Sequence, residues 1–518
     1  MFKPVSVVAA CALLAVMSFA APAKPIAASV VLHADRPGAE IKPEVFGQFA
    51  EHLGSGIYGG IWVGKGSTIP NTDGYRTDVL AALKDLHVPV IRWPGGCFGD
   101  EYHWRNGIGP DREGTVNTNW GGVPEPNTFG THEFLNFAEM IGTKAYVSGN
   151  VGTGSPREMS EWLQYMTGDQ DTALTRLRRA NGRDHPWKVD YFAIGNETWG
   201  CGGNMRPEYY ADQFRQYAAF LKAPPGARPL IIASGGYDGH PEWTKVLIST
   251  VHENLDAIDF HYYTLPSPTR TWTHKGAAVG FPEGEWISTL ASALKLDVHL
   301  KLNIAIMNKY DPQKKVGLFV DEWGTWYDPA PGSNPGFLVQ QNTVRDAVVA
   351  AAELNILESH ADRVRMANIA QMINVLQAMI LTDGPRMVLT PTYHVFHMYI
   401  PFQGATLLPT DVKAPLYKLG KFAVSSVSVS AARAKDGSLV YALANLDPNR
   451  AITVTTTIAG PEVQIISGTI LTGPAMDAHN TFDDPDAVKP APFTGAKMSS
   501  KRLIVALPAK SVVLLRLQ

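Results

Sequence analysis

Cysteine is scarce in this chain, since 518 residues contain 3 cysteines. A disulfide framework is therefore excluded as the main source of stability. Charge of one sign is lacking as well, because Lys+Arg number 45 and Asp+Glu 48, which gives a net charge of −3. Without a basic run, neither nucleic acid nor an anionic membrane surface is an expected partner. The 45% apolar content instead indicates a large globular core, and the expected ligand is neutral or nearly so.

Long apolar runs are also lacking, except at the amino terminus, where residues 5–19 follow Lys3. This pattern, with small residues at Ala21-Pro22-Ala23, predicts that residues 1–23 are a signal peptide and that the protein is exported, to a periplasm or beyond the cell. A retained membrane anchor is the alternative. The run is shorter than the roughly 20 residues that a spanning helix needs, so no membrane partner is expected after cleavage.

Metal-binding patterns are equally sparse. Removal of the amino terminus would leave Cys97 and Cys201, and the sequence leaves open whether they pair or remain free thiols. No cluster of Cys and His has the spacing of a zinc site. His394 and His397 stand at helical spacing, but no neighbouring carboxylate would orient them. No metal and no cofactor are therefore expected.

Between residues 46 and 403, strand-like apolar runs alternate with helical patterns, as in a parallel sheet wound by crossover helices. The candidate strands are 46–53, 88–93, 145–151, 191–196, 230–234, 257–262, 317–321 and 364–372. Their number predicts an α/β fold of the (β/α)₈ TIM barrel type. An open doubly wound sheet is disfavoured, because no glycine-rich phosphate loop follows the first strand.

From residue 404 to 518 the pattern changes to alternating β-branched runs, at 439–446, 452–458, 463–471 and 503–517. Helical periodicity disappears there, so a C-terminal β-sandwich is predicted. The segment 24–45, which includes a strand-like stretch at 28–33, is expected to join this sandwich. The stretch 472–492, rich in Pro, Asp and Ala, is expected to be an irregular loop.

Two glutamates, Glu197 and Glu322, each follow a short apolar run and precede a tryptophan. A carboxylate is costly to remove from water, so two of them at strand ends suggest a pocket that uses them chemically. Paired carboxylates on a barrel rim are suited to cleaving glycosidic bonds. The competing interpretation is an ordinary salt-bridged carboxylate at a strand end. Side chains alternate across a strand, so spacing alone does not decide whether Asp321 or Glu322 faces inward.

Several ordered motifs resemble those of the glycoside hydrolase family 51 α-L-arabinofuranosidases. They are FGQFAEHL at 46–53, RWPGGCF at 92–98, GNE at 195–197, DEW at 321–323 and NIAQMIN at 368–374. The resemblance covers nearly the whole chain after residue 23, including Asn480-Thr481-Phe482 and Pro485 near its end.

This resemblance implies a retaining, exo-acting enzyme that releases terminal α-L-arabinofuranosyl residues. Glu197 would be the general acid/base and Glu322 the nucleophile, on the fourth and seventh barrel strands. In such enzymes the two carboxyl groups are about 5 to 5.5 Å apart. The implied partner is an arabinan, an arabinoxylan or a derived oligosaccharide, and the resemblance also suggests a homo-oligomer.

The resemblance further implies a set of substrate-binding residues: Glu51, Arg92, Cys97, Trp120, Asn196, His261, Tyr263 and Gln371. Arg92 is expected to hold the nucleophile ionised, and Tyr263 to donate to it. The competing interpretations are a structural ion-pair network for Arg92 and an ordinary core histidine for His261. For the whole chain, the alternatives are an endo-acting β-glucanase of the same family and a non-catalytic sugar-binding protein.

Overall fold

The computed structural model describes residues 26–266, 273–460 and 462–518. The segment 1–23, interpreted above as a signal peptide, lies outside the described residues. Within the described ranges, the helices are all too short or too polar to cross a membrane.

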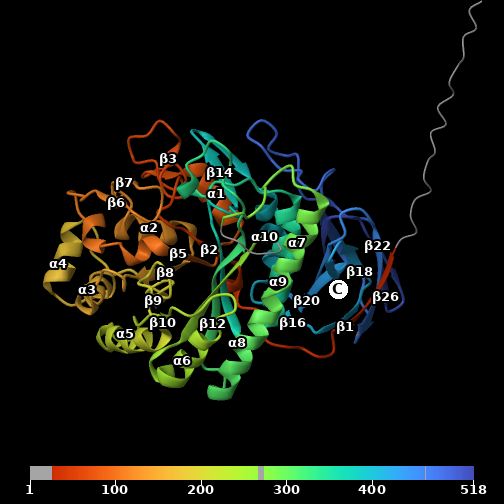
Figure 1. The fold of residues 1–518 in the computed structure, drawn as a ribbon, viewed down its shortest axis with the longest axis horizontal. Helices are drawn as coiled ribbons and strands as arrows, with labels where there is room; N and C mark the ends of the chain where they lie inside the picture. The colour runs from red at the N-terminus through yellow and green to blue at the C-terminus, as the bar shows by residue number, and fades with distance from the viewer. Residues whose placement is uncertain (1–25, 267–272, 461) are drawn as a thin grey trace, which may run out of the picture.

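Eight parallel strands form a closed barrel on one side of the molecule (Figure 1). In chain order they are β2 (Gly47–Phe49), β5 (Val90–Trp93), β8 (Lys144–Gly149), β9 (Tyr191–Ile194), β10 (Leu230–Ala233), β11 (Ala257–Thr264), β12 (Gly317–Thr325) and β13 (Val364–Ile369). Each strand pairs with the next one along the chain, and β13 closes the barrel on β2. The predicted (β/α)₈ barrel is therefore confirmed, and each strand overlaps the run expected to form it.

Ten α-helices accompany the strands in the described part of the chain. They are α1 (Thr77–Asp85), α2 (Thr131–Ile141), α3 (Pro156–Thr167), α4 (Ala173–Ala180), α5 (Pro207–Phe220), α6 (Glu242–Thr250), α7 (Glu283–Ala293), α8 (Leu296–Tyr310), α9 (Val344–Ser359) and α10 (Pro391–Tyr399). Several begin at a Pro in the first turn or at a Ser or Thr side chain that accepts a backbone N–H, as Ser155 does for α3.

The interior of the barrel is filled by apolar and aromatic side chains. One buried cluster joins Val90, Tyr146, Tyr191, Ala193, Ile232, Ala257, Phe319 and Met366, which come from seven of the eight strands. A barrel of this size is a packed core and not a pore. Polar side chains near the carboxyl ends of the strands are therefore supported from below by a rigid layer.

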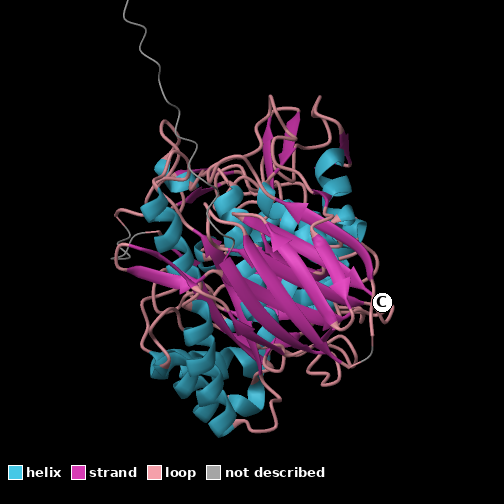
Figure 2. Cartoon of the chain, turned by 90° about the vertical axis from the view of Figure 1, so that its right-hand side faces the viewer, coloured by secondary structure: helices cyan, strands magenta, loops and turns pink. Residues whose placement is uncertain are grey.

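Two sheets stack as a β-sandwich beside the barrel, as Figure 2 shows face-on. One sheet has the order β17 (Thr410–Lys413), β1 (Ile26–His33), β22 (Ile452–Ala459), β26 (Arg502–Leu507) and β25 (Ala496–Ser499). The other has the order β16 (Thr406–Leu407), β20 (Val427–Arg433), β21 (Leu439–Asn445), β27 (Ser511–Leu517), β23 (Ile465–Leu471) and β24 (Ala491–Pro492). The predicted C-terminal sheet domain is confirmed.

β1, the first strand among the described residues, lies within this sandwich. Val30 pairs with Val412 of β17 on one side and with Thr456 of β22 on the other. In Figure 1 this red strand lies among blue ones. We propose 46–403 as the barrel unit and 404–518, joined by 24–45, as the sandwich unit.

Short hairpins in the loops that follow barrel strands were not predicted from the sequence. They are β3 (Asn71–Thr72) with β4 (Tyr75–Arg76), β6 (Thr115–Asn117) with β7 (Val123–Glu125), and β14 (Ile380–Asp383) with β15 (Arg386–Leu389). They are too short and too polar to show a period. The β6–β7 hairpin nevertheless carries one of the expected site residues, Trp120, in its turn.

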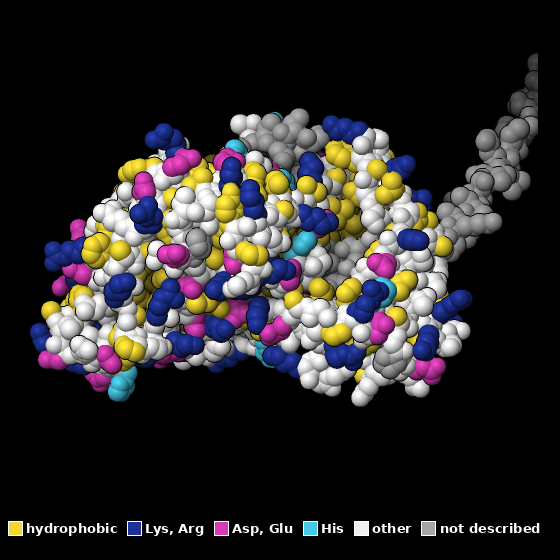
Figure 3. Space-filling model, turned by 90° about the horizontal axis from the view of Figure 1, so that it is seen from below, with side chains coloured by type: hydrophobic (Ala, Val, Ile, Leu, Met, Phe, Trp, Pro, Cys, Tyr) yellow, Lys and Arg dark blue, Asp and Glu magenta, His cyan; other side chains and the backbone are white. Residues whose placement is uncertain are grey.

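The surface carries charges of both signs. On the face shown in Figure 3, basic and acidic side chains are interspersed and do not form a region of one sign. This distribution agrees with the small net charge of −3.

Candidate active site

Glu197 lies just beyond the carboxyl end of β9, in a tight turn. β9 ends at Ile194, Gly195 has φ +83°, and Glu197 itself has a left-handed φ of +40°. A Cβ at Gly195 would lie 2.9 Å from Thr198 Cγ2, so this turn requires glycine. A left-handed φ is uncommon for a glutamate, and such outliers concentrate at functional sites. The turn places the Glu197 carboxylate at the rim of a hollow above the barrel.

Glu322 lies inside β12, because this strand runs past it to Thr325. The expectation that Glu322 follows the end of its strand is therefore wrong. The pairing of β12 is irregular on both sides, and against β13 the register shifts between Val320 and Trp323. A bulge of this kind re-aims successive side chains. As a result, both Asp321 and Glu322 contact residues of other barrel strands.

Asp321 lies below the hollow and has its own partners. Its carboxylate is fully buried and accepts hydrogen bonds from Tyr146 Oη at 2.5 Å and Asn368 Nδ2 at 3.1 Å. Glu322, in contrast, borders the hollow. The structure thereby distinguishes two adjacent carboxylates that spacing could not.

Glu322 is held by two donors. Arg92 Nη1 donates to Glu322 Oε1 at 2.8 Å, and Tyr263 Oη donates to Oε2 at 2.7 Å. The second arm of the guanidinium, Arg92 Nη2, donates to Asn196 Oδ1 at 2.5 Å. The backbone N–H of Asn196 in turn donates to the buried Asp100 carboxylate at 2.8 Å. Arg92 therefore links the segment before Glu197 to the carboxylate of Glu322.

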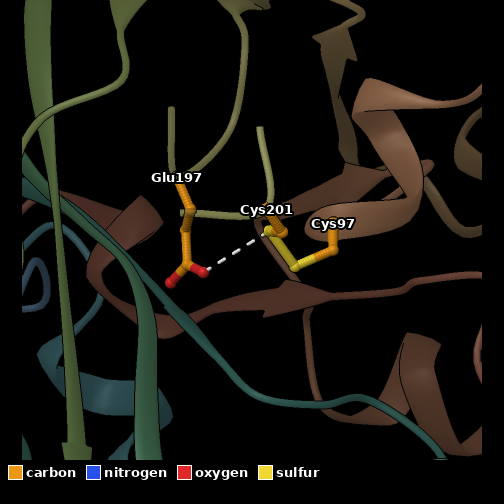
Figure 4. Close-up of side chains that lie close together, drawn as sticks. All are labelled: Cys97, Glu197 and Cys201. Atoms are coloured by element: carbon orange, nitrogen blue, oxygen red, sulfur yellow. Dashed lines mark hydrogen bonds between the residues drawn. A yellow bond between two sulfur atoms is a disulfide. The ribbon is translucent and has the colours of Figure 1, made fainter. Parts of the chain in front are cut away.

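Glu197 has a different environment. His261 Nδ1 lies 2.9 Å from Glu197 Oε1 and 3.7 Å from Glu322 Oε2, so the imidazole bridges the two carboxylates. One oxygen of Glu197 and one of Glu322 lie within 4.8 Å of each other. On its other side, Glu197 Oε2 lies 3.7 Å from the sulfur of Cys201, as Figure 4 shows.

The pKa values of the two glutamates are shifted in opposite directions. Burial raises the pKa of Glu197, and the nearby Glu322 carboxylate raises it further. Burial acts on Glu322 in the same direction, but His261 and Arg92 together hold the pKa of Glu322 below its ordinary value. Burial alone would lower the pKa of His261, yet Glu322, Glu197 and Asp259 raise it to about 9. At neutral pH the imidazole is therefore protonated and donates to Glu197.

A third carboxylate, Glu51, lies in the same hollow. It accepts hydrogen bonds from Phe98 N at 3.0 Å, Trp120 Nε1 at 2.8 Å and Gln371 Nε2 at 3.1 Å. Burial and then the charge of Glu322 raise the pKa of Glu51 to about 7. Glu51, Trp120 and Gln371 thus present a polar wall, although they come from distant parts of the chain.

The two cysteines form a disulfide, with a separation of 104 residues along the sequence. It ties the segment after β5 to the segment after β9, and Cys97 borders the hollow. The question that the sequence left open is answered in favour of pairing. The structure therefore brings all ten expected site residues to one place at the carboxyl ends of the barrel strands.

The described residues offer little for a metal ion. Two clusters have compatible spacing: Cys97 with Glu197 and Cys201, and Glu197 with His261 and Glu322. In the first, the sulfurs are bonded to each other and cannot act as thiolate ligands. In the second, Arg92 already neutralises Glu322, and His261 carries a proton where a ligand needs a lone pair.

Some residues that border the hollow were not among the predicted site residues. Leu338, which has φ +49°, lies in the irregular segment between β12 and α9. Trp326 packs edge-to-face on Tyr263 with ring centroids 4.8 Å apart. An apolar residue in a loop has no distinguishing pattern, whereas Trp326 could be suspected from its nearness to Glu322 along the chain. Trp323, the nearer tryptophan, is instead fully buried and stacks on Phe396.

Family models match two parts of the chain. Residues 82–277 match the model described as "Alpha-L-arabinofuranosidase 1 domain", and residues 321–511 match "Alpha-L-arabinofuranosidase C-terminal domain". Among curated proteins, an "Intracellular exo-alpha-L-arabinofuranosidase" of Bacteroides ovatus is 50% identical over 95% of this chain and 96% of its own length. A "Probable alpha-L-arabinofuranosidase C" of Aspergillus clavatus is 32% identical over 82% of this chain and 86% of its own.

Solved structures agree with these relatives. The "GH51 arabinofuranosidase from Xanthomonas axonopodis pv. citri" is 53% identical, covers 95% of this chain and all of its own (100%), and superposes with a TM-score of 0.94. An α-L-arabinofuranosidase of Thermotoga maritima, solved as an arabinose complex, is 28% identical over 95% of this chain and 99% of its own, with a TM-score of 0.81. The barrel and its paired carboxylates define a glycoside hydrolase. This chain belongs to the α-L-arabinofuranosidases of glycoside hydrolase family 51.

The predicted export of the protein is corrected by these comparisons. The Bacteroides ovatus relative, which matches 95% of the chain, is named an intracellular enzyme, and this contradicts an exported, periplasmic or extracellular location. The prediction rested on a local pattern, namely a short apolar run between one lysine and the small residues at Ala21-Pro22-Ala23. Such a run is one element of a secretory signal and does not by itself establish export.

Proposed function

We propose that this arabinofuranosidase is a retaining, exo-acting enzyme that releases terminal non-reducing α-L-arabinofuranosyl residues from arabinan, arabinoxylan or derived oligosaccharides. The observation that carries the proposal is the approach of the Glu197 and Glu322 carboxylate oxygens to within 4.8 Å. Retaining glycosidases have carboxyl groups about 5 to 5.5 Å apart, and inverting ones leave room for a water molecule at about 6.5 to 9.5 Å.

In the first step, Glu322 acts as the nucleophile and attacks the anomeric carbon of the arabinofuranosyl residue. Its depressed pKa keeps it ionised, and Arg92 and Tyr263 orient its oxygens. Glu197, whose pKa is raised by burial, acts as the general acid and gives its proton to the leaving oxygen. The glycosidic bond breaks as the ester bond to Glu322 forms.

In the second step, water cleaves this ester and Glu197 takes the proton from the water. Formation of the ester removes the negative charge of Glu322, which is one of the causes of the raised pKa of Glu197. The pKa of Glu197 therefore falls after the first step, and the same group changes from acid to base. Attack by water on the face opposite to the first attack restores the original anomeric configuration.

The other expected site residues bind the sugar in this proposal. Glu51, Gln371 and Asn196 offer acceptors and donors to furanose hydroxyls, and Trp120 covers the ring. Cys97 contributes backbone and sulfur surface to the same wall. Loop residues such as Leu338 narrow the hollow, which suits the end of a chain. The name of the Bacteroides ovatus relative, an exo-acting enzyme, supports the exo mode.

The two alternatives have less support. A bifunctional glucanase-xylanase from a metagenome library superposes with a TM-score of 0.60 at 15% identity, so it shares the fold alone. A non-catalytic sugar-binding protein would not need two carboxylates with oppositely shifted pKa values.

A homo-oligomer is also part of the proposal, because the family resemblance suggests one. Sedimentation velocity tests this oligomeric state.

Azide rescue tests the two roles. We expect Glu197→Ala to lose at least about 10³-fold in kcat/KM on arabino-oligosaccharides, and to regain turnover of an activated aryl arabinofuranoside when azide is supplied. Glu322→Ala should form no arabinosyl ester detectable by mass spectrometry. Glu208→Ala, an exposed glutamate on α5, is the matched control and should remain fully active. Undiminished hydrolysis by either active-site variant refutes the catalytic roles proposed for the two glutamates. A first product of inverted anomeric configuration refutes the retaining mechanism.

A further inference from the structure

Two hollows meet at Glu197. The first contains both Glu197 and Glu322, with Glu51 in its wall. The second is bordered by Glu197, Trp199, Tyr237, Asp238, His261, Tyr263 and Leu265. Among the described residues, Glu197 and Tyr263 border both hollows, and Glu322 borders the first alone.

This arrangement indicates which hollow holds each of the two groups joined by the scissile bond. The sugar that is attacked must lie against Glu322, and therefore in the first hollow. The leaving oxygen must lie against Glu197, which protonates it, and the group attached to that oxygen extends beyond Glu197. The second hollow begins there, on the side of Glu197 where no nucleophile is needed.

The wall of the second hollow is a stack of aromatic rings. The ring centroids of Trp199 and Tyr237 are 4.0 Å apart with planes at 30°, and those of Tyr237 and His240 are 4.2 Å apart, also at 30°. Two rings this close to one tyrosine must cover its opposite faces. Tyr237 is therefore clamped from both sides, and it supports Trp199 from behind.

Two adjacent loops supply this stack. Trp199 lies in the segment between β9 and α5, and Tyr237 lies in the segment between β10 and α6. His240 is itself fixed by Glu242, whose Oε1 lies 2.8 Å from His240 Nδ1. The indole of Trp199 is thus held in place before any ligand binds, which reduces the entropy lost on binding.

The chemistry of this wall fits a sugar ring. A saccharide has an apolar face of C–H groups that packs on an aromatic face, and hydroxyl groups around its edge. Trp199 and Leu265 supply apolar surface, and the Asp238 carboxylate, which His299 Nε2 contacts at 2.6 Å, lies at the border of the hollow as an acceptor.

We propose that Trp199, supported by Tyr237, binds the sugar ring on the leaving-group side of the scissile bond and so selects which glycosides are cleaved. The proposal rests on the function proposed above, because it takes Glu197 as the proton donor. Trp199 acts here as a specificity-determining residue for saccharide leaving groups.

The test compares two leaving groups of different size. Steady-state kcat and KM are measured for methyl α-L-arabinofuranoside, whose leaving group is one carbon, and for arabinosylated xylo-oligosaccharides and arabino-oligosaccharides. Trp199→Ala should lower kcat/KM for both kinds of substrate to different extents. For at least one oligosaccharide class, we expect the loss to be about tenfold larger than for the methyl glycoside, because one lost stacking contact changes binding by about this factor. Trp199→Phe should restore most of that difference.

A second variant covers the case in which Trp199→Ala fails to fold. Tyr237→Ala keeps the indole but removes its support, and it should shift the same ratio in the same direction. Tyr209→Ala, an aromatic side chain on α5 that is 51% exposed, is the matched control and should leave the ratio unchanged. An unchanged ratio in both Trp199→Ala and Tyr237→Ala overturns the inference while leaving the proposed function intact. A wild-type enzyme that cleaves none of these arabinosides would instead refute the proposed function.

Discussion

Glu322 receives hydrogen bonds from Arg92 and Tyr263, whereas Glu197 is contacted by His261 and by a disulfide sulfur. Two side chains of the same type therefore differ in their donors, and this difference separates their pKa values. The charges of His261 and Arg92 favour the ionised form of Glu322, whereas burial and the charge of Glu322 disfavour the ionised form of Glu197. Pairs of titratable groups with diverging pKa values are the usual arrangement for acid and base roles.

The pH dependence of kcat/KM should be bell-shaped. Activity needs Glu322 ionised and Glu197 protonated, so the acid limb follows the lowered pKa of Glu322 and the alkaline limb the raised pKa of Glu197. Tyr263→Phe removes a donor to the Glu322 carboxylate, which raises the pKa of Glu322. We therefore expect the acid limb to move to higher pH. The check is kcat/KM for an aryl arabinofuranoside across pH, and an acid limb that stays in place contradicts the expectation.

At this scale the sequence predicted which residues gather and that Arg92 and Tyr263 contact Glu322, but it did not predict the irregular strand around Glu322 or the hairpin that carries Trp120. The motif resemblance placed Arg92, Asn196 and Tyr263 in one site, and the structure brings them together. The choice between Asp321 and Glu322 depends on a register shift of β12 against its two neighbours, and this shift is not encoded within the strand itself. The bond from Trp120 to Glu51 depends on a hairpin too short to leave a pattern.

Helix α9 shows what a periodic pattern can and cannot predict. Its apolar residues at Val344, Ala347, Val348 and Ala351 predicted one buried face. The structure buries the opposite side as well, because α9 packs on the barrel and also against β20, β21 and β27 of the sandwich. The sandwich strands that cover this opposite side come much later in the sequence. The local pattern of α9, which places polar residues there, therefore did not predict that the side is buried.

Glu358, on the sandwich side of α9, should make stability depend on pH. It is fully buried, and burial raises its pKa from an ordinary 4.5 to about 8. The folded state therefore holds a proton that the unfolded chain releases, so stability falls as pH rises from about 4.5 to about 8. Glu358→Gln removes this dependence. We expect the free energy of unfolding of the variant, relative to wild type, to improve by a few kcal/mol between pH 5 and pH 9.

Urea unfolding at the two pH values measures this difference. Glu208→Gln, an exposed position on α5, should show no comparable change with pH. A pH-independent difference between Glu358→Gln and wild type would contradict the explanation.

For the whole molecule, the sandwich depends on its first strand. β1 lies between β17 and β22, and both neighbours come from beyond the barrel in sequence. The fold class was predictable because period-two patterns mark strands wherever they occur. The position of β1 between its partners was not, since pairing over such a distance is set by the packed core and leaves no local pattern.

Two adjacent substitutions in β1 test this dependence. Val30 is 1% exposed and faces the sandwich core, while Val31 is 36% exposed on the opposite face. Val30→Asp places an unpaired charge in the core, and we expect it to cost about 3 kcal/mol or more. Val31→Asp should cost within about 1 kcal/mol. Urea titration measures the free energy of unfolding of both variants. Equal losses of this free energy in Val30→Asp and Val31→Asp would show that β1 adds little to the stability of the sandwich.

The same strand has a consequence for how the protein is made. A ribosome releases β1 before the barrel, and its partners β17 and β22 only after the entire barrel has emerged. Until then, an apolar strand with two open edges must remain soluble, and such edges invite pairing with other chains. Yield during synthesis should therefore depend on how well the nascent barrel or a chaperone covers these eight residues.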